Sequence, residues 1–375
     1  MKKFRKIMTA CALTLMCGAA LTGCGDGGNS TPATTTAAKT TTAAPASTAA
    51  DTTKGADTTA APATTAADST AAQTTAGGGA SGDLIKVGII NNNPNESGYR
   101  TANDKDLTSA FTKENGFDAK FAYGEKNDEQ INQAKKFIQD EVDYLLLSAA
   151  DTAGWDSVLK DAQAADIKVI LFDRKIAADE SLYESSVVSD MEQEGKTAVE
   201  WLKSQNLDKY EIIHIQGQMG TAAQEGRSKA LNETAKELGW TLVAQQTGEW
   251  NAEKAQQIVQ SAIDSKKTFN VIYAENDDMA KGAAAALDKA NISHGVGKDV
   301  IIMGFDCNKW ALKELKAGNW NYDGQCNPFQ SSYLIDIIKK LEKGEKVEKK
   351  IIMQEKGFDA KTITDDDVNK YGIGE

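Results

Sequence analysis

The sequence predicts an α/β protein with two lobes, each built as a doubly wound parallel sheet. The first observation is that short apolar runs alternate with amphipathic segments from Leu84 onward, which is typical of parallel strands joined by helices. The second is that this alternation restarts at about Asp190, and the third is that polar residues directly follow several apolar runs. Because ligands bind beyond the carboxyl ends of such strands, we expect a small-molecule site in the crevice between the lobes.

The elements follow from this alternation in chain order. In the first lobe, strands are expected at residues 84–91, 119–122, 144–148, 167–173 and 185–189. In the second lobe, strands are expected at residues 211–216, 241–246, 270–274 and 300–305. The helix after Asn127 should bury Ile131, Ala134 and Ile138, which recur at helical spacing, and another helix should run from about Asp190 through Trp201.

Two prolines of the predicted lobes follow expected strand ends. Pro94 lies in the Asn-rich segment Asn91-Asn92-Asn93-Pro94-Asn95, which should turn before a helix begins. Pro328 follows Gln325-Cys326-Asn327 and is expected in the first turn of another helix, where its missing N–H costs nothing. The alternative for both prolines is that they only mark loops.

The N-terminus carries a secretion signal. Basic residues among the first six positions precede an apolar run, residues 7–21, that is short for a membrane span and ends in small residues. The sequence Leu21-Thr22-Gly23-Cys24 resembles the signal of bacterial lipoproteins, which implies cleavage before Cys24 and acylation of its sulfur. Residues 1–23 are therefore expected to be a signal peptide and Cys24 a lipid anchor to the membrane. The alternative is that Cys24 is an ordinary residue of a membrane helix.

Residues 24–82 are rich in Thr and Ala and contain almost no large apolar side chains. Such a segment cannot bury enough apolar surface to offset the entropy lost on ordering, so we expect a disordered tether. The remaining chain, residues 83–375, is long enough for two lobes with separate cores.

Composition and motifs exclude several classes of function. The 375-residue chain has a net charge of −12, whereas nucleic-acid-binding proteins normally carry basic patches, so no nucleic acid is expected. No Gly-x-Gly-x-x-Gly follows the first strand, and no cofactor is expected. Cys307 and Cys326 lack CxxC spacing and the chain has only two histidines, so no metal site is expected. A disulfide between the two cysteines stays open, because their geometry decides it.

One strand ends in a pair of charged residues. The run Ile-Lys-Val-Ile-Leu-Phe of residues 167–172 leads directly into Asp173 and Arg174. A buried parallel strand should place this pair at the mouth of the crevice, where it could bind a polar ligand. The alternative is a surface ion pair, since exposed Asp–Arg pairs are common and individually weak.

Several polar stretches follow predicted strands in the same way. They are Glu96-Ser97-Gly98-Tyr99-Arg100, Gly154-Trp155 with Val158-Leu159-Lys160, Leu171-Phe172-Asp173-Arg174, residues 220–227, and Tyr273-Ala274-Glu275-Asn276-Asp277-Asp278-Met279. Together they resemble the sugar-binding proteins of bacterial ABC importers, which have the type I periplasmic-binding-protein fold, and most of all the galactofuranose-binding proteins.

The resemblance implies a specific domain layout. In that fold the chain crosses between the lobes three times, here near Asp190, Gln325 and Ile351, and the crossings form a hinge that closes on the ligand. The N-terminal lobe would comprise residues 83–189 and 326–350. The C-terminal lobe would comprise residues 190–325 and 351–375.

The resemblance also implies the ligand-binding residues. Sugar hydroxyls both donate and accept hydrogen bonds, so a sugar site needs carboxylates, guanidinium groups, amides and an aromatic ring. Asp173 would accept from hydroxyls, while Arg174 and Arg227 would donate in fork geometry. Asn276 would donate and accept. The remaining members of this set are Asp306 at a strand end and Gln325 at the second crossing.

The first loop adds Glu96 and Arg100, which resemble the pair of the galactofuranose-type branch. Tyr99 or Trp250 could stack on the sugar ring, although the alternative is that both are ordinary half-buried aromatic residues. Asp277 is expected to cap the helix that follows it rather than to touch ligand. His214 is expected to be a strand residue with a local hydrogen bond.

These expectations combine into a function. We expect a monomeric extracytoplasmic lipoprotein, anchored to the outer face of the cell membrane, that captures a monosaccharide of the galactofuranose or galactose type and delivers it to an ABC permease. One alternative is a sensory protein that presents sugar occupancy to a membrane receptor. Another is a carbohydrate-active enzyme, which needs two facing carboxyl groups. Arginines beside Asp173 and Asp306 would hold both carboxylates ionised, which disfavours a general acid, so no catalytic residue is assigned.

Overall fold

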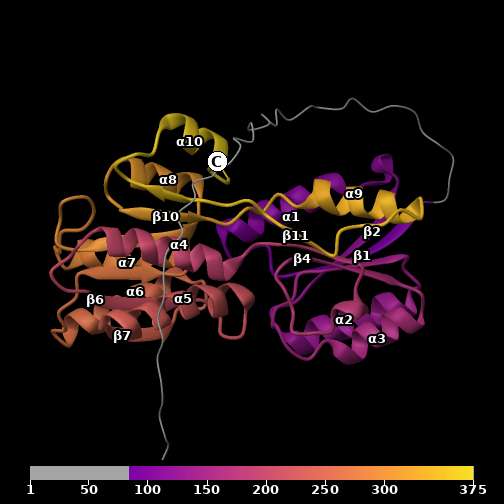
Figure 1. The fold of residues 1–375 in the computed structure, drawn as a ribbon, viewed down its shortest axis with the longest axis horizontal. Coiled ribbons are helices and arrows are strands. Elements are labelled where there is room, and N and C mark those ends of the chain that lie inside the picture. The colour runs from indigo at the N-terminus through magenta and orange to yellow at the C-terminus, as the bar shows by residue number, and fades with distance from the viewer. Residues whose placement is uncertain (1–83, 375) are drawn as a thin grey trace, which may run out of the picture. The chain divides into compact units, whose positions relative to one another are not determined.

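The computed structural model describes residues 84–374 and confirms the predicted arrangement of two parallel-sheet α/β lobes (Figure 1). The first sheet contains, in spatial order, β11 (Lys350–Ile352), β5 (Ser185–Val188), β4 (Lys168–Asp173), β3 (Tyr144–Leu147), β1 (Ile85–Asn91) and β2 (Phe117–Tyr123). The second sheet contains β12 (Gly357–Asp359), β10 (Tyr322–Gln325), β9 (Ile301–Asp306), β8 (Val271–Ala274), β6 (Glu211–Gln216) and β7 (Thr241–Thr247). Neighbouring strands are parallel except β10 and β12, which are antiparallel.

Every strand predicted from the sequence is present, with small shifts at the ends. The strands that sequence reasoning missed are β10, β11 and β12. Each is short, and β10 has the sequence Tyr-Asp-Gly-Gln, which lacks the apolar run that marks the other central strands. Its neighbours β9 and β12 bury it nevertheless.

Helices cover both faces of the first sheet (Figure 1). These helices are α1 (Gly98–Ala110), α2 (Asn127–Gln139), α3 (Asp156–Ala164) and α9 (Ser331–Glu342), with the short 3₁₀ helices η1 (Lys113–Asn115) and η2 (Glu180–Leu182) in connections. Helices α1 and α9 share an apolar cluster with Ile89 and Leu146, whereas α2 and α3 share another with Ile90 and Leu147. Adjacent strand residues thus face opposite layers, as the two-residue period of a strand requires. Helix α2 buries Gln130, Ala134 and Phe137 fully, while Ile131 and Ile138, expected to be buried, lie at the margin.

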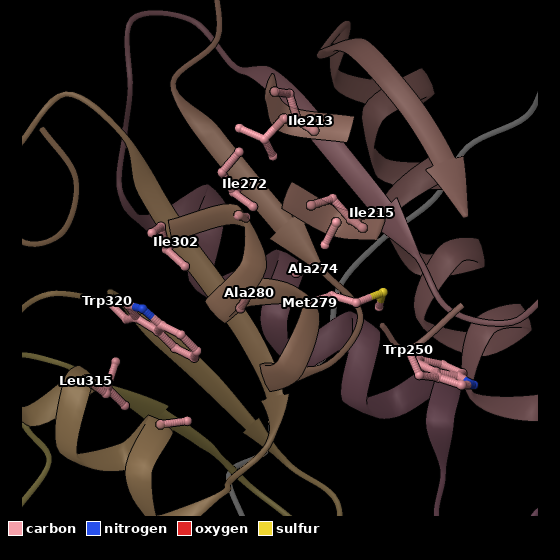
Figure 2. Packing of buried hydrophobic residues seen from close by; sticks show 14 of the residues in the cluster. Ile213, Ile215, Trp250, Ile272, Ala274, Met279, Ala280, Ile302, Leu315 and Trp320 are labelled. Atoms are coloured by element: carbon pink, nitrogen blue, oxygen red, sulfur yellow. The ribbon is translucent and has the colours of Figure 1, made fainter. Parts of the chain in front are cut away.

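The second sheet is covered in the same manner. Its helices are α4 (Met191–Ser204), α5 (Ala222–Leu238), α6 (Ala252–Asp264), α7 (Asp277–Lys289), α8 (Lys309–Lys316) and α10 (Asp365–Tyr371). Ile212 packs with α4 and α5, whereas its neighbour Ile213 packs with α6, α7 and α8. Figure 2 shows this second cluster, with Trp250 at its margin beyond Met279.

The chain passes between the two sheets three times, as predicted. The first crossing is residues 189–190 between β5 and α4, the second is residues 326–330 between β10 and α9, and the third is residues 353–356 between β11 and β12. Strand β11 still pairs with β5, so the third crossing begins slightly later than the expected boundary at Ile351. Pro328 lies in the second crossing and not in the first turn of α9, so that prediction was wrong. Among residues 84–374, no helix is long and apolar enough to span a membrane.

Candidate functional site

One pocket, here called the interlobe pocket, lies between the lobes where strands of both sheets end. It is lined by Glu96, Ser97, Tyr99, Arg100, Asp173, Arg174, Met191, Ala223, Arg227, Trp250, Asn276, Asp306 and Cys326. The structure therefore brings together all of the predicted ligand-binding residues except Gln325. These residues are far apart in sequence, and the strand ends of the two sheets and the helices that follow them place them together.

The interlobe pocket is nearly closed. Its free volume is about 30 Å³, which is enough for about two water molecules and too small for a monosaccharide. Side chains or whole lobes must therefore move before a ligand of that size can enter. A larger surface cavity, of about 620 Å³, lies elsewhere, beside Trp310 between α7 and α8. None of the buried charged side chains described below lines that cavity.

On the first lobe, Asp173 is the centre of a buried network. It ends β4 and accepts hydrogen bonds from Ser148 Oγ at 2.7 Å and Tyr99 Oη at 2.8 Å, and its Oδ2 lies 2.8 Å from Arg100 Nη2. Burial alone would raise the pKa of Asp173, but Arg100, Arg174 and the hydrogen bond from Ser148 outweigh it and hold the pKa below its ordinary value. The carboxylate is therefore ionised at neutral pH. Because Asp173 and Arg174 are both buried, the surface ion-pair alternative was wrong.

The two arginines on this lobe differ in how tightly the protein holds them. Arg100 donates through Nη1 to Asn91 Oδ1 at 2.9 Å, in addition to its contact with Asp173. Arg174 makes only long contacts, at 3.5 Å to Glu96, 3.5 Å to the Ala149 carbonyl and 3.7 Å to Asp173. Arg174 therefore keeps donor capacity for a ligand, whereas the donors of Arg100 are largely engaged.

On the second lobe, Arg227 plays the corresponding central part. It projects from α5 and binds Glu194 Oε2 through Nε at 2.8 Å and Nη2 at 2.7 Å. Its Nη2 also lies 3.3 Å from Asp306 Oδ1, and its Nη1 donates to the Glu275 carbonyl. Burial would lower the pKa of Arg227, but Glu194 and Asp306 raise it well above its ordinary value. The guanidinium therefore stays charged.

Asp306 ends β9 among other buried carboxyl groups. Burial raises the pKa of Asp306 well above its ordinary value, and Arg227 only partly opposes this, so the expectation that an arginine holds Asp306 ionised was wrong. Asp277 Oδ2 accepts from the backbone N–H of Asn308 at 2.7 Å, and Asp323 accepts from that of Cys307 at 3.3 Å. These two carboxyls thus hold the turn that carries Asp306. Burial raises the pKa of Asp323 to about 7.

The start of α7 differs from the prediction. Asn276, not Asp277, is the N-cap, because its side chain accepts a hydrogen bond from the Met279 backbone N–H at 2.9 Å. The capping role assigned to Asp277 was therefore wrong. His214 is a buried strand residue whose Nε2 lies 2.8 Å from Glu275 Oε1, which confirms its predicted local role.

Three pocket residues have positive backbone φ angles, which residues other than glycine rarely adopt. The φ angles of Asp173, Trp250 and Asp306 are 62°, 61° and 104°. Such conformations cost of order 1–3 kcal/mol each and cluster at functional sites. Here they turn the chain at the end of a strand or before a helix and direct the side chains into the interlobe pocket.

The aromatic residues are more buried than a stacking platform on an open cleft would be. Tyr99 and Trp250 are each 5% exposed. Trp250 packs so closely on Gly217 that a Cβ there would lie 1.9 Å from the indole ring. The Trp250 Nε1–H has no hydrogen-bond partner, so it is a free donor at the pocket.

Gln325 lies at the end of β10 and lines a separate cavity of about 150 Å³ beside the crossings, with Glu194 and Glu355. The structure therefore does not bring Gln325 into the interlobe pocket. Cys307 and Cys326 are both buried free thiols, which answers the question of a disulfide that the sequence left open. Cys24 lies outside the described residues.

Sequence reasoning missed the residues that support the ligand-facing groups. Ser148 directly follows β3 and fixes Asp173. Asn91 ends β1 and fixes Arg100, and Glu194 lies in the first turn of α4 and fixes Arg227. Ser148 and Asn91 could have been found, because both are polar residues that end apolar runs. Glu194 carries no such signal, since its partner is on a different helix.

Gly98 shows how the lobes meet at the pocket edge. Its N–H donates to Asp278 Oδ2 of the other lobe at 3.2 Å. A Cβ at this position would lie 1.9 Å from Asn308 Oδ1, also of the other lobe. Only glycine therefore fits here when the lobes are in this arrangement.

Comparison with known proteins places these features in context. Residues 87–346 match the periplasmic binding protein domain family. The chain is 31% identical over 296 residues to the fructose import binding protein FruE of Bifidobacterium longum, covering 76% of this chain and 88% of that protein. It is 29% identical over 255 residues to the galactofuranose-binding protein YtfQ of Escherichia coli, covering 66% and 79%.

A solved structure has the same fold. It is the periplasmic binding protein component of the arabinose ABC transporter from Shewanella sp. ANA-3, bound to α- and β-L-arabinofuranose. The TM-score is 0.69 at 29% identity, with 74% of this chain and 92% of that chain covered.

Proposed function

Because the chain belongs to the periplasmic binding protein family as a sugar-binding protein of ABC importers, we propose that it captures one neutral monosaccharide in the interlobe pocket and delivers it to a membrane permease. The members of this family are sugar-binding transport proteins and not enzymes, so the carbohydrate-enzyme alternative is set aside.

The single observation that carries the site is its balance of charge. Three guanidinium groups, those of Arg100, Arg174 and Arg227, line the interlobe pocket together with the carboxyl groups of Glu96, Asp173 and Asp306. Each arginine lies within 4.0 Å of a carboxylate: Arg100 of Asp173, Arg174 of Glu96 and Arg227 of Glu194. A charged ligand would leave one of these groups without a partner, whereas sugar hydroxyls can accept from the arginines and donate to the carboxylates.

The relatives support a sugar that can adopt the furanose form. One relative is named for fructose, another for galactofuranose, and the related structure holds arabinofuranose. We therefore propose a furanose-forming monosaccharide, with the galactofuranose or galactose type of the sequence analysis among the candidates. Glu96, Tyr99, Asp173, Arg174, Trp250, Asn276 and Asp306 are the proposed contacts.

Isothermal titration of residues 83–375 with D-fructose, D-galactose, L-arabinose and D-ribose tests the proposal. We expect binding of at least one sugar with a Kd in the micromolar range or below. Gluconate and glucosamine serve as charged controls and should not bind. Failure of every neutral sugar, or preference for a charged one, would refute the neutral-sugar site.

The membrane anchor is proposed from residues 1–24, which lie outside the described part of the chain. Acylation of Cys24 would hold the binding lobes at the outer face of the membrane, with residues 25–82 as tether. Mass spectrometry of the protein from membranes should find a diacylglyceryl-modified Cys24, and Cys24→Ala should abolish the modification. A sensory protein remains the second candidate, and co-purification with a permease or with a receptor separates the two.

A further inference from the structure

A single carboxyl group joins the three crossings between the lobes. Glu355 lies in the third crossing, and its Oε1 accepts hydrogen bonds from Ser189 Oγ in the first crossing and from the Asn327 backbone N–H in the second, each at 2.7 Å. Glu355 therefore bonds the third crossing directly to the other two, and Ser189 Oγ also lies 3.8 Å from Cys326 Sγ of the second crossing. Movement of any crossing must strain or break one of these bonds.

A second carboxyl group faces Glu355 without a donor of its own. Glu194 Oε2 is engaged by Arg227, but Glu194 Oε1 is buried and has no hydrogen-bond partner. Carboxyl oxygens of Glu194 and Glu355 and the sulfur of Cys326 lie within 4.8 Å of one another. A buried carboxylate oxygen beside a second carboxylate is strongly unfavourable, and a proton placed between them removes the repulsion and supplies the missing donor.

We propose that Glu194 and Glu355 share one proton, and that this pair, here called the hinge latch, positions Arg227 for the ligand by bonding it to all three crossings. The proposal rests on the proposed function, because positioning is meaningful only if the interlobe pocket binds the sugar. Glu355 lines the neighbouring cavity of about 150 Å³ and does not line the interlobe pocket, so it is a positioning residue and not a ligand contact.

The charged and titratable groups around the latch favour a retained proton. Arg227 and Asp306 lie on the ligand side, Cys326 lies in the second crossing, and the neighbouring cavity is lined by Asp190, Tyr322 and Lys356. Arg227 is already shared between Glu194 and Asp306, and Lys356 binds Asp367 at 3.2 Å, so neither cation is free to neutralise Glu355. Burial and the charge of Glu194 accordingly raise the pKa of Glu355 to about 9. The pKa of the Cys326 thiol is also raised by burial, so it stays neutral over the same range.

The latch has a pH dependence with a definite sign. The pKa of Glu355 rises from an ordinary 4.5 to about 9 in the folded protein, so folding takes up a proton between these values. Stability from the latch is therefore fully present below pH 4.5 and is lost as pH rises toward 9. If separation of the lobes loosens the latch, sugar binding also takes up a proton, and affinity falls by up to about tenfold per pH unit over the upper part of this range.

Glu355→Gln tests the latch, because its amide keeps an oxygen for Ser189 and Asn327 and offers a permanent N–H to Glu194. Glu345→Gln, at an exposed position of the segment before β11, is the matched control. Infrared spectra at pH 7 should show, in wild type and in Glu345→Gln, a carbonyl band from the protonated latch in addition to the bands of other protonated carboxyls such as Asp306. The latch band alone should be missing in Glu355→Gln. This readout needs no sugar, so its failure is distinct from failure of the proposed function.

The functional readout is sugar affinity, measured by titration between pH 6 and pH 9. D-fructose, D-galactose and L-arabinose are tried at pH 6, and the one that binds wild type is used throughout. Wild type and Glu345→Gln should lose affinity as pH rises, and Glu355→Gln should hold its affinity within about twofold. Glu355→Ala, which lacks both the oxygen and the donor, should bind more weakly at every pH. Absence of the latch band from wild type would overturn the proposal. Parallel pH profiles for wild type and Glu355→Gln, or saturable Zn²⁺ binding by Glu194 and Glu355, would each overturn it as well.

Discussion

Arg174 is the pocket arginine whose removal should affect the ligand more than the fold. Its contacts with Glu96, Asp173 and the Ala149 carbonyl are all 3.5 Å or longer. Without it, Asp173 still binds Arg100, Ser148 and Tyr99. Arg174→Ala therefore leaves no buried carboxylate without a partner, and because only long contacts are lost we expect a stability loss of about 1 kcal/mol, as for one hydrogen bond.

The expected loss of sugar affinity is larger. A charge-assisted hydrogen bond contributes about 1.5–3 kcal/mol, which corresponds to about a 10- to 150-fold increase in Kd. Isothermal titration with a sugar from the panel gives Kd, and urea unfolding gives stability. Arg174→Lys keeps the charge but loses the planar fork, so its Kd should lie between those of wild type and Arg174→Ala.

Lys175→Ala is the matched control, because Lys175 is the exposed neighbour of Arg174 and does not line the interlobe pocket. Its Kd and stability should equal those of wild type. The reasoning would be refuted if Arg174→Ala bound sugar within twofold of wild type. It would also be refuted if the substitution unfolded the protein, because Arg174 would then be a structural residue like Arg100.

Three further predictions follow from the pocket and its surroundings. Gly98→Ala should clash with Asn308 when the lobes meet. Overpacking costs about 1–3 kcal/mol, so the Kd measured by titration should rise by about 5- to 150-fold while the melting temperature changes little. Unchanged affinity would show that the lobes bind sugar in another arrangement. Asp173→Asn should remove a stabilisation that is present above pH 3.8 and lost below it, because the pKa of Asp173 is lowered in the folded protein. Acid unfolding followed by circular dichroism should show a shallower transition in the variant. Identical acid profiles would contradict this. Cys307 should be inert to a thiol reagent in the native protein and react once it unfolds, because it is buried and, unlike Cys326, does not line the interlobe pocket. Rapid labelling of Cys307 without unfolding would contradict this.

The sequence by itself determined the layers of the fold. Alternation of apolar runs with amphipathic segments reports local burial, and this is why the strands from β1 to β9 could be predicted. The polar residues that end those strands were predictable for the same reason, since the carboxyl ends of parallel strands meet at one edge. Asp173, Arg174, Asn276 and Asp306 do lie together there.

The sequence pattern gave wrong predictions where contacts with residues distant in sequence determine the local structure. Strand β10 is polar in sequence and is buried only because β9 and β12 flank it. Asn276 and Asp277 are both acceptable helix caps by residue type, and in the folded protein Asn276 caps α7 while Asp277 accepts from the backbone N–H of Asn308.

Only the tertiary structure decided which charged groups are paired within the protein and which keep free donors for a ligand. Arg100 and Arg174 are equivalent by residue type, but only Arg100 is held tightly by buried partners. Glu194 and Glu355 are brought together only because the chain crosses between the lobes three times. Periodicity in a sequence reports which side of an element is buried, whereas pairing between groups depends on distances that exist only after both lobes have folded and met.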